Sequence, residues 1–198
     1  MPKRSGIAFI IAGTALILSA LSLFLYNQSE DTHAGQEAEK LLGDVQSVIQ
    51  EKENRSPATS APEMPVTEID GYGYVGYLTI PSLELELPVM SEWDYTRLKI
   101  APCRQFGSAG TDDLVIAAHN YKNHFGRLSQ LEAGDPVIFT DMDGVENAYE
   151  VAFIETLAPT EVEAVQKSGH DLVLYTCTYG GKTRVSVFCD RPKAEKAP

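Results

Sequence analysis

An apolar stretch near the N-terminus divides this chain into two parts. Residues 6–26 contain no charged side chain, and at about 21 residues they are long enough to cross the ~30 Å hydrocarbon core of a bilayer as a helix. A buried helix of a soluble protein would ordinarily show a polar face, and this stretch shows none. Any globular domain must therefore be built from the residues that follow.

The charges on either side of this stretch predict its orientation in a membrane. Lys3 and Arg4 precede it, whereas Glu30 and Asp31 follow it. The positive-inside rule then places residues 1–5 in the cytoplasm and the rest of the chain outside. A cleaved signal peptide is the alternative, but its apolar core is usually about 7 to 15 residues long. We therefore expect a single-pass protein of the cell membrane.

The segment 27–68 connects this predicted transmembrane helix to the folded domain. Between residues 31 and 53, apolar side chains recur at near-helical spacing among Glu, Gln and Lys, which predicts an amphipathic stalk helix whose apolar stripe packs on the domain, on a partner or on the membrane. Residues 54–65 are a linker rich in Pro, Ser and Ala. This leaves a domain over residues 69–191, about 120 residues and enough for one hydrophobic core, followed by a tail, 192–198.

Composition narrows the function further. The net charge of −12 and the isoelectric point near 4.7 argue against a nucleic-acid partner, because that affinity comes from Lys and Arg meeting phosphate. The chain has three cysteines, so at least one thiol is unpaired unless it bonds another chain. Cys103 and Cys189 are either a disulfide or two buried thiols, and the sequence leaves both readings open.

The domain is predicted to be mainly β. Alternating apolar residues, bounded by Gly, Pro and Asp, mark short strands. The expected strands are 75–80, 83–89, 114–118, 136–140, 148–155, 172–176 and 184–189, and the expected short helices are 91–100, 123–131 and 160–167. Many short strands with few helices indicate a closed or nearly closed barrel rather than alternating strands and helices.

Three polar side chains stand where predicted strands end or begin. Cys177 closes one apolar run, Arg184 opens the next, and His119 closes the earlier run 114–118. Such side chains can converge on one rim of a barrel. A thiolate is a strong nucleophile, and a nearby cation raises its fraction. The three residues are therefore a candidate active site, although an isolated cysteine is more often a buried structural residue.

The flanking residues resemble those of a sortase, a membrane-anchored cysteine transpeptidase of Gram-positive cell walls. The similar segments are Gly-Tyr-Leu-Thr-Ile-Pro at 76–81, Leu-Val-Ile-Ala-Ala-His-Asn at 114–120, and Val-Leu-Tyr-Thr-Cys at 173–177, close to the family's Thr-Leu-x-Thr-Cys signature. Val173 stands where the signature has threonine, and Ala118 where a glycine often precedes the histidine. The short Cys-to-Arg spacing, with Thr178 and Tyr179 after the cysteine, is more similar to class B or other clostridial-type sortases.

The resemblance implies a fold and a role for each residue. The fold is a closed eight-stranded β-barrel with short helices. Cys177 would be the nucleophile that forms a thioacyl-enzyme with a C-terminal sorting signal, His119 the general acid and base, and Arg184 the group that holds the oxyanion. An amine of peptidoglycan or of a pilin would then accept the acyl group, with no organic cofactor. As substrate-binding residues we expect Thr176, Leu174 and Asn120.

Other residues compete for these roles. His170 is the alternative to His119, and Arg191 is the alternative to Arg184. For His33 and His124 we expect solvated surface positions. The run 141–146 (Asp-Met-Asp-Gly-Val-Glu) has oxygen ligands that a calcium loop could use, but it is more typical of a turn between two strands, so we expect no metal.

Two other functions remain as alternatives. A cell-wall cysteine peptidase or L,D-transpeptidase would also use Cys and His on a β-rich domain, but there the cysteine usually precedes the histidine in the chain. A membrane-tethered β-barrel binding module with an incidental cysteine is the non-catalytic alternative.

Overall fold

The computed structural model describes residues 3–54 and 63–192. The chain forms two compact units, Met1–His33 and Ala34–Pro198, and helix α1 (Lys3–Glu53) contributes to both. In the first unit, the large apolar side chains between Ile7 and Tyr26 are exposed. The length and the apolar composition of this part of α1 are sufficient for it to cross a membrane.

The second half of α1 is an integral part of the second unit. Its buried residues follow the helical i, i+3, i+4 spacing, so they form one apolar stripe: Ala34, Ala38, Leu41, Val45 and Ile49. The stripe packs on barrel side chains that include Tyr74, Met90 and Leu98. The sequence left open whether this stripe packs on the domain, on a partner or on the membrane. In the structure it packs on the domain.

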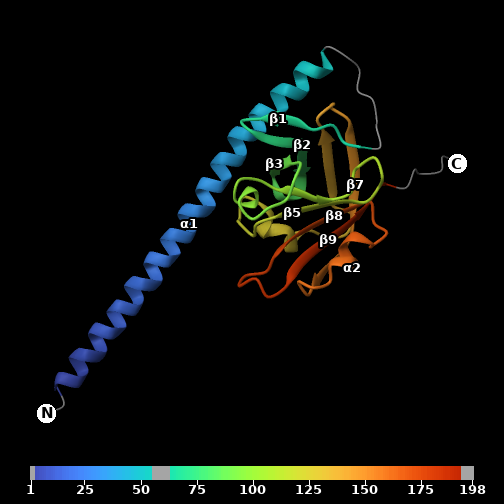
Figure 1. Ribbon diagram of the computed structural model, residues 1–198. Coiled ribbons are helices and arrows are strands. Elements are labelled where there is room, and N and C mark those ends of the chain that lie inside the picture. The colour runs from blue at the N-terminus through green and yellow to red at the C-terminus, as the bar shows by residue number, and fades with distance from the viewer. Residues whose placement is uncertain (1–2, 55–62, 193–198) are drawn as a thin grey trace. The chain divides into compact units, whose positions relative to one another are not determined.

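The second unit is a β-barrel (Figure 1). Its strands are β1 (Thr67–Ile69), β2 (Tyr72–Ile80), β3 (Leu85–Met90), β4 (Cys103–Phe106), β5 (Leu114–Ala118), β6 (Pro136–Asp141), β7 (Glu146–Leu157), β8 (Leu172–Cys177) and β9 (Arg184–Asp190). They are hydrogen-bonded in the order β1-β2-β3-β4-β5-β8-β9-β7-β6, and β6 pairs again with β2. Strands β2 to β9 therefore close an eight-stranded barrel, with β1 added beside β2, and the predicted fold class is confirmed.

Short helices fill the connections between the strands. They are η1 (Pro81–Leu83), η2 (Arg97–Lys99), η3 (Phe125–Gln130) and α2 (Val162–Gln166). The last three lie inside the predicted helical ranges but are shorter. The sequence missed β1 and β4, because each has only a few residues and takes its strand geometry from its partner, as Cys103 does from Ala117.

The closure of the barrel depends on one glycine. Gly76 has φ +146° and pairs with Asp141 across the β2–β6 contact. A Cβ atom at this position would lie 1.9 Å from the carbonyl oxygen of Thr140. Glycine is therefore required where the two backbones approach, next to an irregularity in β2 between Tyr74 and Gly76.

The barrel interior is a continuous apolar core. It contains inward-facing residues from every strand of the barrel except β4, among them Leu78, Leu87, Leu114, Phe139, Val151, Leu174 and Val187. Cys189 belongs to this core, whereas Cys103 belongs to the cluster beneath α1.

The three cysteines are all free thiols. Cys103 is in register with Ser186 of β9, but β5 and β8 lie between them. Three inter-strand steps amount to about 14 Å, well beyond the Cα separation that a disulfide allows. Cys103 and Cys189 are therefore two buried thiols, the second of the two readings that the sequence left open.

Candidate active site

Strands β5, β8 and β9 are neighbours, and their ends bring three polar side chains together. In the parallel pair β5–β8, Ala118 is opposite Thr176, so His119 follows β5 beside Cys177, the last residue of β8. In the antiparallel pair β8–β9, Cys177 is opposite Arg184. Because adjacent strands are about 4.8 Å apart, Cys177 lies between the histidine and the arginine on one rim of the barrel.

Cys177 is the accessible thiol of the chain. It is partly buried at the end of β8, whereas Cys103 and Cys189 are each 0% exposed. Burial raises the pKa of each of these two thiols to about 12, so they stay protonated at neutral pH. The reactivity of the chain toward an electrophile is therefore concentrated at Cys177.

His119 lies in a partly apolar environment. Its Nε2 atom is buried and has no hydrogen-bond partner within the described ranges 3–54 and 63–192. Burial lowers the pKa of the imidazole, and the positive charge of Lys99 lowers it further. The ring is therefore neutral at neutral pH, the form that accepts a proton from a thiol.

Arg184 is held over the turn that joins β8 to β9. Its Nη1 donates to the carbonyl oxygens of Gly181, at 3.2 Å, and Thr183, at 3.1 Å. A guanidinium has five N–H donors in a planar fork. Two bonds from Nη1 to the turn orient this fork and leave its other N–H donors without a hydrogen-bond partner in the described part of the chain.

A groove runs along the outer face of the barrel at this rim. Its cavity of about 190 Å³ has walls from β8, from the chain between β3 and β4, and from the segment that leads into α2. The lining side chains include Trp93, Tyr95, Leu157, Pro159, Val162, Tyr175 and Arg184. Since side chains alternate along a strand, Tyr175 and Cys177 lie on the same face of β8. Cys177 does not line the cavity itself, but it is opposite Arg184, which does.

The three predicted substrate-binding residues differ in their burial and contacts. Thr176 is buried, and its hydroxyl donates to the carbonyl oxygen of Ala118 at 2.9 Å, which ties β8 to β5 beside the site. Leu174 is 0% exposed in the barrel core. Asn120 is partly buried directly after His119. Their contacts with a substrate remain predictions.

The alternative histidine lies at the other end of β8. The Nδ1 atom of His170 is 2.7 Å from Asp190 Oδ1, and its ring packs against Phe153 and Phe188. Leu172 and Cys177, the two ends of β8, are about 17 Å apart along the strand, so His170 cannot reach the thiol. The expectation for His124 was wrong, since this residue is 0% exposed; its loop folds inward because the next residue, Phe125, is buried in the core.

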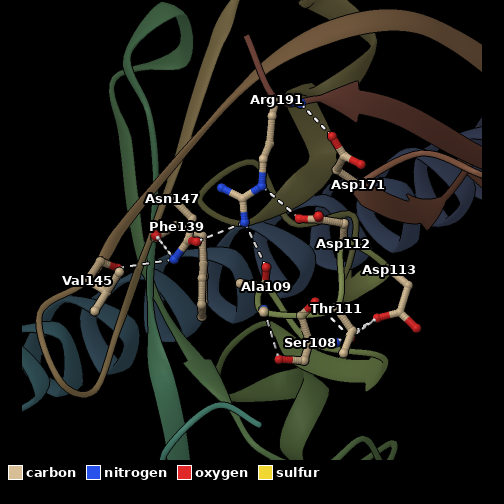
Figure 2. A network of polar contacts seen from close by, with 11 residues as sticks. Ser108, Ala109, Thr111, Asp112, Asp113, Phe139, Val145, Asn147, Asp171 and Arg191 are labelled. Carbon is tan, nitrogen blue, oxygen red and sulfur yellow. Dashed lines mark hydrogen bonds and ion pairs between the residues drawn. The ribbon is translucent and has the colours of Figure 1, made fainter. Parts of the chain in front are cut away.

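Arg191 also lies at this far end, where its backbone N–H donates to Asp171 Oδ2 at 2.7 Å, and its side chain forms a network of its own (Figure 2). Its guanidinium donates to Asp112 Oδ1 at 2.7 Å, to the carbonyl oxygen of Ala109 at 2.7 Å and to Asn147 Oδ1 at 3.0 Å. It also stacks over the ring of Tyr149, 5.1 Å from its centroid. The network ties the end of β9 to β7 and to the loop before β5, so Arg191 is a structural residue.

The acidic run 141–146 forms the turn between β6 and β7. The Asp141 carboxylate accepts the backbone N–H groups of Asp143 and Val145, and Asp143 pairs with Lys52 of α1. In the part of the chain that the structure describes, no group of three or more His, Cys, Asp or Glu side chains is arranged to hold a metal ion.

Sequence reasoning missed the aromatic residues around the site. Trp93 and Tyr95 contact each other, with ring centroids 5.1 Å apart, and the ring of Tyr121 lies 5.0 Å from that of His119. The position of Trp93 and Tyr95 in the cavity with Arg184, and that of Tyr121 beside His119, have no local signature. The position of Tyr121 two residues after the candidate histidine was the one available signal.

Comparison with known proteins agrees with this architecture. Sortase A of Bacillus anthracis is 27% identical over 121 residues, which are 58% of this chain and 57% of that protein. The chain therefore spans little more than half the length of this relative. Among solved structures, sortase C1 of Streptococcus suis is 27% identical with a TM-score of 0.53, covering 62% of this chain and 75% of that one.

A Clostridium perfringens sortase D5 transpeptidase shares the fold, with a TM-score of 0.61 at 17% identity over 80% of this chain and 99% of that one. The names of these relatives span classes A, C and D, so they do not select one class. The sortase domain family matches residues 78–192, more than half of the chain. The chain therefore belongs to the sortase family.

Proposed function

We propose that this protein is a membrane-anchored sortase that cleaves a C-terminal sorting signal and transfers the acyl part to an amine of peptidoglycan or of a pilin. The observation that carries the proposal is the register of β5, β8 and β9, which lines up His119, Cys177 and Arg184. An incidental cysteine in a binding module would not require a histidine and an arginine on both neighbouring strands.

The reaction follows from this arrangement. The neutral His119 takes the proton of Cys177, and the thiolate attacks the carbonyl carbon of the scissile peptide bond. Arg184 donates hydrogen bonds to the oxyanion that forms. His119 then gives its proton to the leaving amine, and a thioacyl-enzyme remains. An incoming amine loses a proton to His119 as it attacks the thioester. The C–S bond then breaks, and His119 returns that proton to the sulfur of Cys177.

The groove beside Tyr175 supports the proposal that the substrate is a peptide. Its walls combine apolar and aromatic side chains with the cation of Arg184, and such walls bind apolar side chains of an extended peptide while polar groups orient its backbone. Within the family, we propose a class B-like or other clostridial-type sortase, on the basis of the short spacing from Cys177 to Arg184 and of the Thr178–Tyr179 pair after the cysteine.

The exposed apolar side chains of residues 6–26 support a membrane anchor. With Lys3 and Arg4 before them, the proposed topology has residues 1–5 in the cytoplasm and the catalytic domain, 69–191, outside. Residues 27–68 would then connect the anchor to the domain, with the second half of α1 packed on the barrel.

Mass spectrometry can test the proposed reaction. The protein is incubated with a library of sorting-signal peptides, with and without candidate amines. We expect a thioacyl adduct on Cys177, transfer to an amine, and no turnover by Cys177→Ala, whose small side chain at a strand end leaves the fold intact. Cleavage without transfer would favour a cysteine peptidase instead.

A thiol-reactive probe provides the matched control. In the native protein it should label Cys177 and leave Cys103 and Cys189 unlabelled until the protein is unfolded. Turnover by Cys177→Ala above background would remove Cys177 from its role.

A further inference from the structure

The second half of α1 touches the loop that carries the proposed catalytic histidine. A Cβ atom on Gly35 would lie 2.7 Å from Asn123 Nδ2 and 3.0 Å from Asn123 Cβ. Rotation of the asparagine side chain could move Nδ2 away, but it would leave its Cβ in place. A Cβ atom at position 35 would therefore require Asn123 Cβ to move by a few tenths of an ångström, and a longer side chain must also find room beside it.

Asn123 belongs to a compact turn that begins at His119. The backbone N–H groups of His124 and Gly126 both donate to the carbonyl oxygen of Tyr121, at 3.0 and 2.9 Å. The N–H of Phe125 donates to the carbonyl oxygen of His119 at 3.2 Å. These bonds lie on both sides of Asn123, so a displacement of Asn123 moves the backbone of His119 and Tyr121.

Packing sets the orientation of the His119 ring. A hydrogen bond from one ring nitrogen usually orients a functional imidazole, but Nε2 of His119 has no such partner in the described part of the chain. Its ring instead lies against that of Tyr121, with centroids 5.0 Å apart and planes at 40°. Tyr121 in turn packs edge-on against the buried ring of His124, 5.5 Å away.

We infer that the second half of α1 positions the catalytic histidine, with Gly35 as the contact residue and the Asn123–Tyr121 turn as the link to the His119 ring. The inference rests on the proposed role of His119. It makes α1 a positioning element of the active site as well as a connection to the anchor. Gly35 serves this contact because glycine allows the helix to approach the turn closely, although glycine lowers helix stability relative to other residues.

Gly43 on the same helix provides a matched control. A Cβ atom there would meet nothing within 4 Å. Leucine favours the helix equally at both positions, so Gly35→Leu and Gly43→Leu differ mainly in the contact with Asn123.

The experiment uses the full chain in detergent and two measurements. The first is kcat/KM for transpeptidation, which we expect to fall in Gly35→Leu by up to about 10²-fold, the loss that a ~1 Å misplacement of a catalytic group can cause. The second is the NMR titration of the His119 ring without substrate. Displacement of the turn lets water reach the ring, so its pKa should rise toward the ordinary value, because burial holds it down. Gly43→Leu should match wild type in both.

The titratable or charged groups on this turn and on the neighbouring elements are unchanged in both variants. They are Lys99 of η2, Tyr121 and His124 of the turn, and Cys177 and Arg184 of the neighbouring strands. A change in the His119 titration that appears in Gly35→Leu alone therefore reports the position of the turn.

A second set of variants applies if Gly35→Leu does not fold. Gly35→Ala should lower kcat/KM and shift the titration in the same direction by less. Asn123→Gly removes the atoms that the new Cβ meets, so the double variant should behave as Asn123→Gly alone. A wild-type His119 titration in the folded Gly35 variants, or a double variant that shows the sum of the two single effects, would overturn the inference.

The titration separates this inference from the proposed function. If Cys177→Ala retained turnover, the proposed function would fail, yet the titration would still show whether α1 positions the ring. If Cys177→Ala were inactive while both Gly35 variants matched wild type, only the positioning role would be lost.

Discussion

At the scale of residues, the two arginines at opposite ends of β9 have different surroundings. Arg184 opens β9 beside Cys177, whereas Arg191 follows the other end of β9 and bonds Asp112, Asn147 and a backbone carbonyl. A guanidinium is planar and donates in a fork, and lysine keeps the charge but loses the fork. The same substitution should therefore have opposite consequences at the two positions.

We expect Arg184→Lys to lower kcat/KM by roughly 10²-fold or more, as for loss of an oxyanion donor, with little change in stability and in the pH optimum. Arg191→Lys should lower the free energy of unfolding by about 2 kcal/mol, because charge-assisted hydrogen bonds are lost, and should keep kcat/KM near that of wild type. Kinetics and urea unfolding of both variants check this. Near-native activity of Arg184→Lys would contradict the assignment.

The burial of His119 predicts a dependence of stability on pH. Its pKa is lowered in the folded protein, so between that value and the unfolded value of ~6.5 the unfolded state binds more protons. Its contribution is full above about pH 6.5 and is lost as the pH falls through the folded pKa. Urea unfolding at several pH values should therefore show a smaller loss of stability on acidification in His119→Asn than in wild type. Equal slopes would show that the ring is not desolvated in solution.

At the scale of elements, closure of the barrel depends on the contact between β2 and β6. Gly76 combines a positive φ with a Cβ position 1.9 Å from the Thr140 carbonyl oxygen. Gly71 also has a positive φ, +81°, but a Cβ there would meet nothing within 4 Å. Substitution of Gly71 therefore tests backbone strain alone, whereas substitution of Gly76 tests backbone strain together with a steric clash.

We expect Gly71→Ala to lower the free energy of unfolding by about 1 kcal/mol, the cost of an unfavourable backbone conformation. Gly76→Ala should lower it by at least about 3 kcal/mol or prevent folding, since the β2–β6 hydrogen bonds must also separate. Chemical unfolding followed by circular dichroism measures both values. Similar losses in the two variants would mean that the barrel closes without this close contact.

At the scale of the whole molecule, one helix, α1, contains both an exposed apolar segment and a segment that packs on the β-barrel. Residues 6–26 expose apolar side chains, whereas the apolar stripe that begins at Ala34 is buried on the barrel. The first part of the helix is suited to a lipid environment by its length and apolar composition, and the second part packs its apolar stripe on protein. The chain should therefore stay attached to membranes through its N-terminal part while the barrel remains in water.

After cell fractionation, we expect the intact protein in the membrane fraction, with the barrel accessible to protease added outside the cells. N-terminal sequencing of the mature protein provides the control. A mature chain that begins after Tyr26 would show a cleaved signal in place of an anchor.

The sequence by itself determined the local properties of this protein. Period-two patterns located most strands, the apolar stretch marked the N-terminal helix, and Cys177, His119 and Arg184 were recognisable as polar residues at strand ends. Each of these features depends on residues within one short segment. The resemblance to sortase motifs indicated that the three polar residues belong to one site. The predicted barrel was confirmed, while the roles of the three residues await the experiments above.

Only the tertiary structure decided which segments are neighbours. It placed β5 next to β8, where Thr176 bonds Ala118 across 58 positions of sequence, and so brought His119 beside Cys177. It also moved Arg191 to the far end of the barrel and packed α1 against the His119 turn. Strand pairing and side-chain packing join residues that are distant in the chain, and no local pattern specifies their partners.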